Sequence, residues 1–269
     1  MTAAPPMKTS THALIDSHCH LDFAAFDKDR NDVMNRCEAL GVSDIVIPGV
    51  TAATWENLLH LCEQHTPHSN VSLHCALGMH PIFLSQHLEE HITRLDALLA
   101  ARKVVAVGEI GLDFFLPELD QTTQIHLFEQ QLFLAQKHDL PVILHTRKSH
   151  DKTLSILKKH CIRGGIAHAF NGSMQQARSY LDLGFKLGFG GMLTFQRSRK
   201  LRQLAKELPL EAIVLETDSP DMTVEPHHGE RNSPEYIPFV LEALTEIRTE
   251  KAQEIAAITT ANTRSILSI

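Results

Sequence analysis

The chain has 269 residues, of which 43% are hydrophobic and 21% charged, and its formal net charge is −7 at pH 7. No apolar run approaches the roughly 18 residues that span a bilayer, which argues against a membrane role. The negative charge argues against broad electrostatic attraction to a nucleic-acid backbone, so a phosphate-bearing substrate would need a locally positive site.

The first twelve residues show no strand or helix pattern. Their only Lys or Arg is Lys8, and they lack the apolar stretch of a secretory signal. We expect a flexible leader over residues 1–12 and one domain over 13–269. Five cysteines without a CxxC pair indicate a reducing cytoplasm. We expect Cys37, Cys62 and Cys161 to fill the core.

Eight short β-branched or apolar runs predict strands, and longer amphipathic stretches alternate with them. The predicted strands cover residues 13–20, 44–48, 71–78, 104–111, 141–145, 165–169, 185–189 and 212–218. Helical periodicity covers residues 28–40, 121–138 and 173–183. Trp55 is interpreted as helix packing and Cys75 as interior filling.

This alternation predicts one closed parallel (β/α)8 barrel, a TIM barrel. The main alternative is an open doubly wound sheet, which usually has a glycine-rich turn after its first strand. Here that turn reads His18-Cys-His-Leu-Asp22 and contains no glycine. No linker or repeat indicates a second domain.

Histidines and carboxylates stand where several of these strands end. Alternate residues of a strand point to one face, so His18 and His20 project together. An isolated pair of this kind is equally well explained as two core histidines whose ring nitrogens are hydrogen-bonded within the protein. In a barrel, however, all strand ends meet at one rim. That rim would also collect Glu109, His145, His168 and Asp218.

Four imidazoles and two carboxylates buried at one rim need a compensating partner, because desolvated charges are costly. Divalent cations are the natural partner. A nitrogen and oxygen donor set without thiolate suits zinc and also accepts manganese or magnesium. The sequence therefore predicts a divalent-metal centre at the C-terminal rim.

Three carboxylates are predicted to support these ligands. Asp16 and Glu216 lie one pleat deeper than His18 and Asp218, where they could hydrogen-bond the ligand imidazoles. Backbone or water is the alternative partner for each. Asp113 follows Glu109 on the same face and is expected to support the site or contact substrate.

Three residues are candidates for substrate contact. Arg147 follows His145 and suits a phosphate oxygen, with a rim salt bridge as the alternative. His80 follows the third predicted strand and could reach a substrate. Arg231 is the best phosphate candidate in the aperiodic loop at 219–234. His227 and His228 of that loop are expected to be solvated rather than ligands.

Five motifs together resemble the TatD family of metal-dependent hydrolases, and they run in order across nearly the whole chain. They are Asp16-Ser-His-Cys-His-Leu21, Val107-Gly-Glu-Ile-Gly-Leu-Asp113, Pro141-Val-Ile-Leu-His-Thr-Arg147, His168-Ala-Phe170 and Glu216-Thr-Asp-Ser-Pro220. The HxH pair is shared by the wider amidohydrolase superfamily, whereas the glutamate pattern is specific. The resemblance implies two divalent ions, Zn, Mn or Mg. One would be held by His18, His20 and Asp218 and the other by His145 and His168, with Glu109 as the bridge.

The chain also departs from the family pattern. Ala169 and Asn171 stand where cysteine and serine are common, and Asp221 stands where an aromatic residue is frequent. The run Gly229-Glu-Arg-Asn232 has a glutamate in place of the family's lysine. The acidic Asp221 and Glu230 argue against high affinity for a long nucleic-acid strand.

The resemblance implies a DNase-type phosphodiesterase, 3′-5′ exonuclease-like, that acts on DNA or another phosphoester. A metal-activated water would be the nucleophile, and Asp218 would orient it and accept its proton. The nearest alternative is an esterase or amidase on the same centre, such as an aminoacyl-tRNA deacylase. A non-catalytic metal-binding scaffold is disfavoured, because structural zinc sites normally close their coordination with fewer ligands. No segment indicates an obligate protein partner.

Overall fold

The computed structural model describes residues 13–64 and 69–269. The leader predicted at residues 1–12 lies outside the described part of the chain. Within that part, no helix is both long and apolar enough to cross a membrane.

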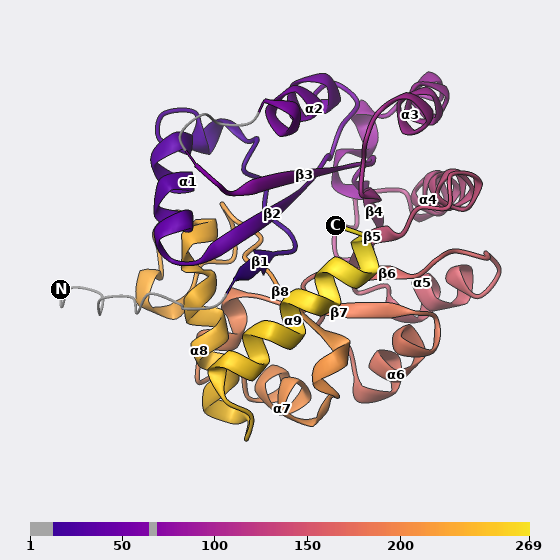
Figure 1. Ribbon diagram of the computed structural model, residues 1–269. Coiled ribbons are helices and arrows are strands. Elements are labelled where there is room, and N and C mark those ends of the chain that lie inside the picture. The colour runs from indigo at the N-terminus through magenta and orange to yellow at the C-terminus, as the bar shows by residue number, and fades with distance from the viewer. Residues whose placement is uncertain (1–12, 65–68) are drawn as a thin grey trace.

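Eight parallel strands follow one another around a barrel in chain order (Figure 1). They are β1 (Leu14–Asp16), β2 (Val42–Pro48), β3 (Ser72–Leu77), β4 (Ala106–Asp113), β5 (Val142–Arg147), β6 (Gly165–Ala167), β7 (Phe185–Phe189) and β8 (Ile213–Leu215). The segments that follow β1 and β8 close the barrel, since Ser17 N donates to Leu215 O at 3.0 Å and Asp218 N donates to His18 O at 2.8 Å. The predicted TIM barrel is confirmed.

Three strands end two or more residues before their predicted ends. The strands β1, β6 and β8 end at Asp16, Ala167 and Leu215, before His18, His168 and Asp218. The sheet ladder therefore stops just below the rim, and these three side chains extend from the bends beyond it.

Helices surround the barrel, and their ends are determined locally. They are α1 (Arg30–Ala39), α2 (Trp55–Glu63), α3 (Glu90–Ala101), α4 (Gln121–Lys137), α5 (His150–Leu157), α6 (Met174–Asp182), α7 (Arg199–Glu207), α8 (Ile237–Ile247) and α9 (Ala252–Leu267). At the start of α4, the Asp120 side chain accepts a hydrogen bond from Thr123 N at 2.7 Å. Ser173 and Gln176 form a capping box on α6. The three predicted helices are confirmed within two residues at each end.

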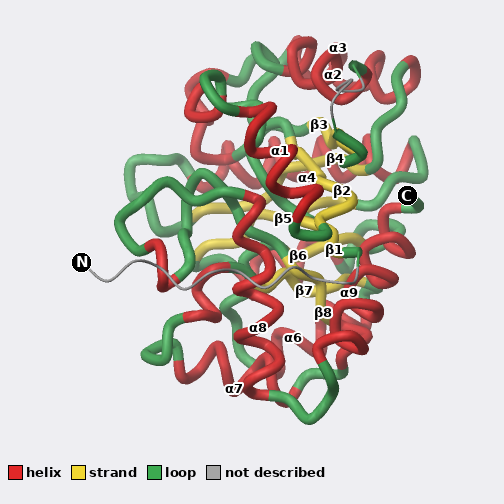
Figure 2. The backbone as a smooth tube through the Cα atoms, turned by 60° about the vertical axis from the view of Figure 1, so that its left-hand side comes forward, coloured by secondary structure: helices red, strands yellow, loops and turns green. Residues whose placement is uncertain are grey.

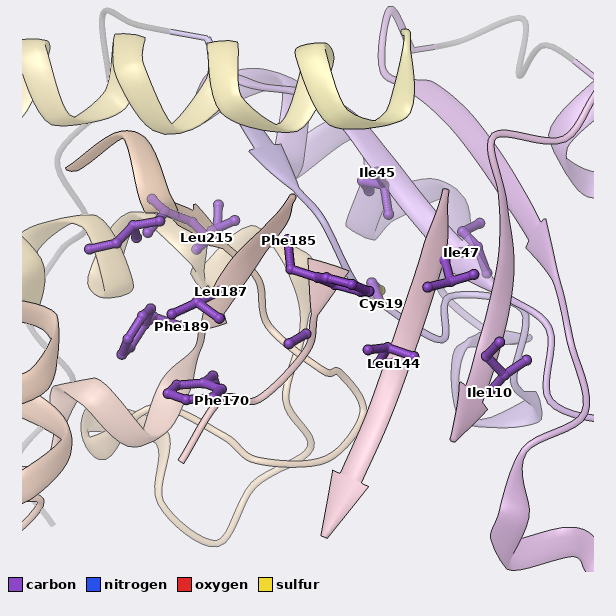
Figure 3. Close-up of a cluster of buried hydrophobic side chains, with 14 of the residues drawn as sticks. Cys19, Ile45, Ile47, Ile110, Leu144, Phe170, Phe185, Leu187, Phe189 and Leu215 are labelled. Carbon is purple, nitrogen blue, oxygen red and sulfur yellow. The ribbon is translucent and has the colours of Figure 1, made fainter. Parts of the chain in front are cut away.

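The strands bury side chains on both faces. Val46, Ala106 and Ile143 belong to one buried cluster inside the barrel. Ile45, Leu144 and other side chains of the opposite face pack against the helices (Figure 3). Trp55 is also fully buried in this outer layer, as predicted, and its indole N–H donates to Gly78 O at 3.0 Å.

Helix α9 covers the N-terminal end of the barrel. Leu267 joins the interior cluster, and Asn262 Nδ2 donates to Ile213 O at 2.7 Å. Figure 2 shows α9 on one side of the strands and many of the connecting loops on the other. The bottom of the barrel is thus plugged, and the mouth at the carboxyl ends of the strands is the face where side chains can meet a substrate.

The prediction for one cysteine was wrong. Cys37 is buried, Cys62 packs against the core and Cys75 is 3% exposed, whereas Cys161 is exposed. Cys161 follows α5 in an irregular segment rather than lying on the inner face of a helix.

Candidate metal centre

The first group of predicted ligands gathers around one oxygen of Glu109. His18 Nε2 lies 3.2 Å from Glu109 Oε2 and 3.4 Å from His20 Nε2. It also lies 3.5 Å from Asp218 Oδ1, and His20 Nε2 lies 3.7 Å from the same atom. Two imidazole nitrogens and two carboxylate oxygens thus face one small volume.

A second group faces the other oxygen of the same carboxylate. Glu109 Oε1 lies 3.1 Å from His145 Nδ1, 3.1 Å from His80 Nε2 and 3.5 Å from His168 Nε2. Glu109 therefore stands between two sets of histidines, with one oxygen directed at each.

His80 belongs to the ligand cluster itself. It is 5% exposed, and the imidazole is held because its Nδ1 accepts a hydrogen bond from Ile82 N at 3.1 Å. The sequence predicted for His80 only that it could reach a substrate, and not that it would lie among the candidate ligands. The signal that could have found it is its position two residues after Gly78, at the rim end of β3, which is the same placement that identified the other ligands.

The donor set fits divalent cations. Three groups each present three ligand atoms within 4.8 Å of one another, namely His18, His20 and Glu109; His18, His168 and Asp218; and His80, Glu109 and His145. Every donor is an imidazole nitrogen or a carboxylate oxygen, which suits zinc, manganese or magnesium.

The charges of these groups depend strongly on one another. Burial raises the pKa of Asp218 to about 7, although His168 opposes this shift. Burial disfavours the charged form of His168, but the carboxylates of Asp218 and Glu109 raise its pKa to about 10. Burial alone would raise the pKa of Glu109, yet the surrounding histidines hold it well below its usual range. Such mutually perturbed groups in a barrel mouth are typical of functional sites.

Asp113 supports one ligand from behind. Its buried Oδ2 accepts a hydrogen bond from His145 Nε2 at 3.0 Å, which leaves His145 Nδ1 directed at Glu109. Arg147 lies next to Asp113, with 3.9 Å between NH1 and Oδ2, and its guanidinium stacks over the Phe115 ring at 3.8 Å. The Arg147 side chain is 47% exposed, so it retains hydrogen-bonding capacity at the mouth.

Glu216 supports another ligand. Its Oε1 accepts a hydrogen bond from Ala169 N at 2.6 Å and lies 3.4 Å from His168 Nδ1. The carboxylate fits there because Gly188 has no side chain, since a Cβ at that position would come within 2.1 Å of Glu216 Oε2.

Of the two partners predicted for Asp16, the structure shows the backbone and not a ligand imidazole. Its Oδ1 accepts hydrogen bonds from Thr217 N at 2.9 Å and His18 N at 3.2 Å, and the Thr217 hydroxyl donates to its Oδ2. Strand β1 ends at Asp16 and the chain bends at residues 17 and 18, so the two-residue alternation does not continue to His18. Asp16 therefore holds backbone rather than a ligand imidazole.

Arg231 is bound by another part of the chain. Its guanidinium donates to Asp29 Oδ1 at 2.8 Å and Asp29 Oδ2 at 2.7 Å, and it stacks over Phe26. This bidentate pair ties the 219–234 loop to the segment before α1. Neither His227 nor His228 belongs to the ligand groups, and His227 stacks on Tyr236 with 4.1 Å between ring centroids.

The backbone at Asp218 is in an unusual conformation. Its φ is 57°, in the left-handed region, while its N–H donates to His18 O. Non-glycine residues in this region are uncommon, and asparagine and aspartate tolerate it best. The strand ends of β1 and β8 together thus fix where the Asp218 carboxylate points.

Comparisons with known proteins agree with this geometry. The family described as TatD related DNase matches residues 15–268. The uncharacterized metal-dependent hydrolase YjjV of Escherichia coli K12 is 41% identical over 258 residues, which cover 95% of this chain and 98% of that protein. A crystal structure of the YjjV TatD homolog from E. coli K12 superposes with a TM-score of 0.90 at 41% identity, with 95% and 98% of the two chains covered.

One similar protein has a more specific name. The 3′-5′ ssDNA/RNA exonuclease TatD of Erwinia tasmaniensis is 32% identical over 264 residues, which cover 95% of this chain and all of that protein. The family match over nearly the whole chain, these identities and the barrel with its histidine and carboxylate cluster agree: the chain belongs to the TatD family of metal-dependent hydrolases.

Proposed function

We propose that the protein hydrolyses phosphodiester bonds in single-stranded DNA from the 3′ end, with two divalent metal ions at the barrel mouth. The observation that carries the proposal is Glu109, whose two carboxylate oxygens face different histidines, His18 for one oxygen and His80 and His145 for the other. A carboxylate in this position suits a bridge between two cations. The exonuclease name of the Erwinia relative supports the choice of a phosphodiester substrate.

The residues of the cluster have three roles, which are to hold the metal ions, to orient the attacking water and to accept its proton. Two divalent cations would stabilise charge on the attacking and leaving oxygens of the phosphoester. Asp218 would orient the attacking water and accept its proton, because its Oδ1 faces the Nε2 atoms of His18 and His20. Asp113 and Glu216 keep His145 and His168 in the orientation that ligation requires.

Arg147 is the residue proposed to contact the substrate phosphate. It stacks on Phe115, which is itself 50% exposed, and a planar guanidinium suits a phosphate oxygen. Arg231 would have to leave its bidentate pair with Asp29 to do the same, so the geometry favours Arg147.

We also propose that the metals are Zn, Mn or Mg and that the protein works in the cytoplasm. The five cysteines are free, which suits a reducing compartment.

A substrate screen tests the function. The metal-loaded protein, with Zn, Mn or Mg supplied separately, is incubated with single-stranded DNA, RNA, bis(p-nitrophenyl) phosphate and p-nitrophenyl acetate, and the products are identified by mass. We expect metal-dependent release of mononucleotides from the 3′ end of DNA, and no release by Glu109→Ala. Cleavage of the carboxylic ester alone, with every phosphodiester intact, would replace the proposal by the esterase or amidase alternative.

A further inference from the structure

A pocket of about 730 Å³ lies beside the metal centre. Its wall includes Ala169, Gly188 and Gly190. Ala169 follows the ligand His168 and donates its N–H to Glu216, and both glycines lie against Glu216. The pocket therefore borders the backbone that follows His168 and that packs against Glu216.

The pocket is positively charged in a protein whose net charge is −7. Arg197, Arg199 and Lys200, around the start of α7, line it, and no aspartate or glutamate is among its lining residues. Across residues 13–64 and 69–269, none of these three cations takes part in an ion pair. Clustered cations without acidic partners repel one another and raise the local concentration of anions. This is the locally positive surface that a phosphate-bearing substrate needs.

The pocket also offers an apolar surface. Met192, Leu201 and Met222 line it and are partly exposed. Phe170 and Phe189, labelled in Figure 3, close it from the side of the core. A nucleobase has apolar faces of this kind to bury, whereas inorganic phosphate or a small phosphomonoester does not.

Asn171 adds an oriented donor. Its exposed side chain lines the pocket, and its Oδ1 lies 3.1 Å from His150 Nε2, while His150 Nδ1 lies 3.3 Å from the Tyr180 hydroxyl. Burial lowers the pKa of His150, so its imidazole is neutral and has one N–H. Because an amide oxygen only accepts, that N–H donates to Asn171, and the Tyr180 hydroxyl donates to Nδ1. The Asn171 Nδ2 group remains available to a ligand.

We propose that this pocket binds a nucleotide of single-stranded nucleic acid next to the scissile bond. Arg197, Arg199 and Lys200 bind its phosphates, Met192, Leu201 and Met222 receive its base, and Asn171 Nδ2 donates to an acceptor on the base. This inference rests on the proposed phosphodiesterase function and adds where a nucleotide of that substrate binds relative to the metal centre. The acidic Asp221 and Glu230 do not line the pocket, so they leave this binding mode open.

Binding is measured on the full-length, metal-loaded protein with a labelled oligothymidine whose linkages are all phosphorothioate, which resist hydrolysis. Fluorescence anisotropy is recorded over a range of salt concentrations. The variant with Arg197→Gln, Arg199→Gln and Lys200→Gln should bind on the order of 10- to 100-fold more weakly. The slope of log affinity against log salt should fall by about 0.7 for each lost phosphate contact. These side chains are exposed, so the fold should be retained, and thermal unfolding checks this.

The matched control is Lys206→Gln, which removes a charge from the same helix at an exposed position outside the pocket. It should leave affinity and salt slope near the wild-type values. Hydrolysis of bis(p-nitrophenyl) phosphate by Lys206→Gln should also stay within about twofold of the wild-type rate.

The possible results test the pocket proposal and the proposed phosphodiesterase function independently. Unchanged affinity and salt slope in the triple variant, with DNA hydrolysis intact, would overturn the pocket and leave the phosphodiesterase standing. A selective loss of binding in a protein that cleaves no phosphodiester would support the pocket as a nucleic-acid site and overturn the proposed catalytic function. The additional change Asn171→Ala should alter the relative affinities for oligonucleotides of different bases but not the salt slope. A change in the salt slope alone would contradict the proposed contact between Asn171 and the base.

Discussion

At Glu109, each carboxylate oxygen has its own set of histidines. Glu109→Ala should therefore lower metal content and turnover together, because the bridge that offsets repulsion between two cations is removed. The loss should exceed the roughly 10- to 100-fold that removal of an outer hydrogen-bond partner costs. Metal analysis beside the rate at saturating substrate checks this.

Glu230→Gln is the control for that change. Glu230 is exposed and contacts His227 at 2.8 Å rather than the ligand cluster, so metal content and turnover should stay near the wild-type values. If Glu109→Ala keeps both ions and normal turnover, the bridging assignment is wrong.

Asp218 is proposed both as a ligand and as a base, and asparagine separates these roles. The amide oxygen can still contact a cation but cannot take up the proton as a carboxylate does at neutral pH. Asparagine also tolerates the left-handed backbone at this position, so the loop should keep its shape. Asp218→Asn should reduce turnover by about 100-fold or more while the group formed by His80, Glu109 and His145 keeps its metal.

Asp113→Asn provides the comparison. Asp113 acts through its hydrogen bond to His145, so its loss should lower metal affinity and activity in parallel. Full metal content with near-normal turnover in Asp218→Asn would rule out the base role, and parallel losses in that variant would assign Asp218 to ligation alone.

At the scale of elements, one polar cluster around the buried Asp44 joins β2, β3 and α9 at the closed end of the barrel. Asp44 accepts hydrogen bonds from His74 at 2.8 Å, Ser43 at 2.7 Å and Arg264 at 3.2 Å. Burial by itself would raise the pKa of Asp44, but these partners outweigh it and lower that pKa from 3.8 to about 2. The folded chain therefore favours the charged carboxylate more than the unfolded chain does.

This shift predicts how stability depends on pH. The stabilisation is complete at pH values above the unfolded pKa near 4 and is lost as the pH falls through about 2. Asp44→Asn should lower the free energy of unfolding by about 2 kcal/mol at pH 7, with a smaller difference from wild type below pH 4. Urea unfolding at a series of pH values checks this.

Asp182→Asn serves as the control for that experiment, because Asp182 is exposed at the end of α6. It should leave the free energy of unfolding at pH 7 near the wild-type value. A difference between Asp44→Asn and wild type that stays constant from pH 7 to pH 3 would contradict the assigned pKa shift.

At the scale of the whole molecule, the cluster draws on five strand ends around the barrel, at β1, β3, β4, β5 and β6, and on the segment after β8. Cations that bind only the folded state should stabilise the whole domain, by about 2.7 kcal/mol at a free metal concentration 100 times the Kd. For a domain of this size, chelation should lower Tm by about 5–10 °C.

Calorimetry of metal-verified samples with and without chelator measures this shift. Glu109→Ala should show a much smaller one, because its metal is already weakly held. Equal Tm values for the loaded and chelated wild-type protein would show that the cluster does not bind metal in the folded state.

The order of the strands and the gathering of six histidine and carboxylate donors at one rim could be read from the sequence alone. Apolar runs of strand length alternate with helical periods, and a parallel barrel places the carboxyl end of every strand at one rim. His18, His20, Glu109, His145, His168 and Asp218 each follow such a run, so the topology brings them together whatever the details of packing. Local periodicity was sufficient because each ligand's position depends only on its own strand.

Tertiary structure alone decided the contacts between distant segments. Arg231 pairs with Asp29, 202 residues away, and Asp16 holds Thr217, 201 residues away, rather than an imidazole. The pocket beside the centre combines Ala169 and Asn171, after β6, with Arg197 and Lys200, which come after β7. Such contacts depend on the paths of loops and on the residue at which each strand ends its hydrogen-bond ladder. Neither feature produces a periodic pattern in the sequence, so neither could be predicted from it. The sequence by itself therefore determined the barrel and the donors at its rim, and only the packed chain decided which side chains support them and where a substrate can lie.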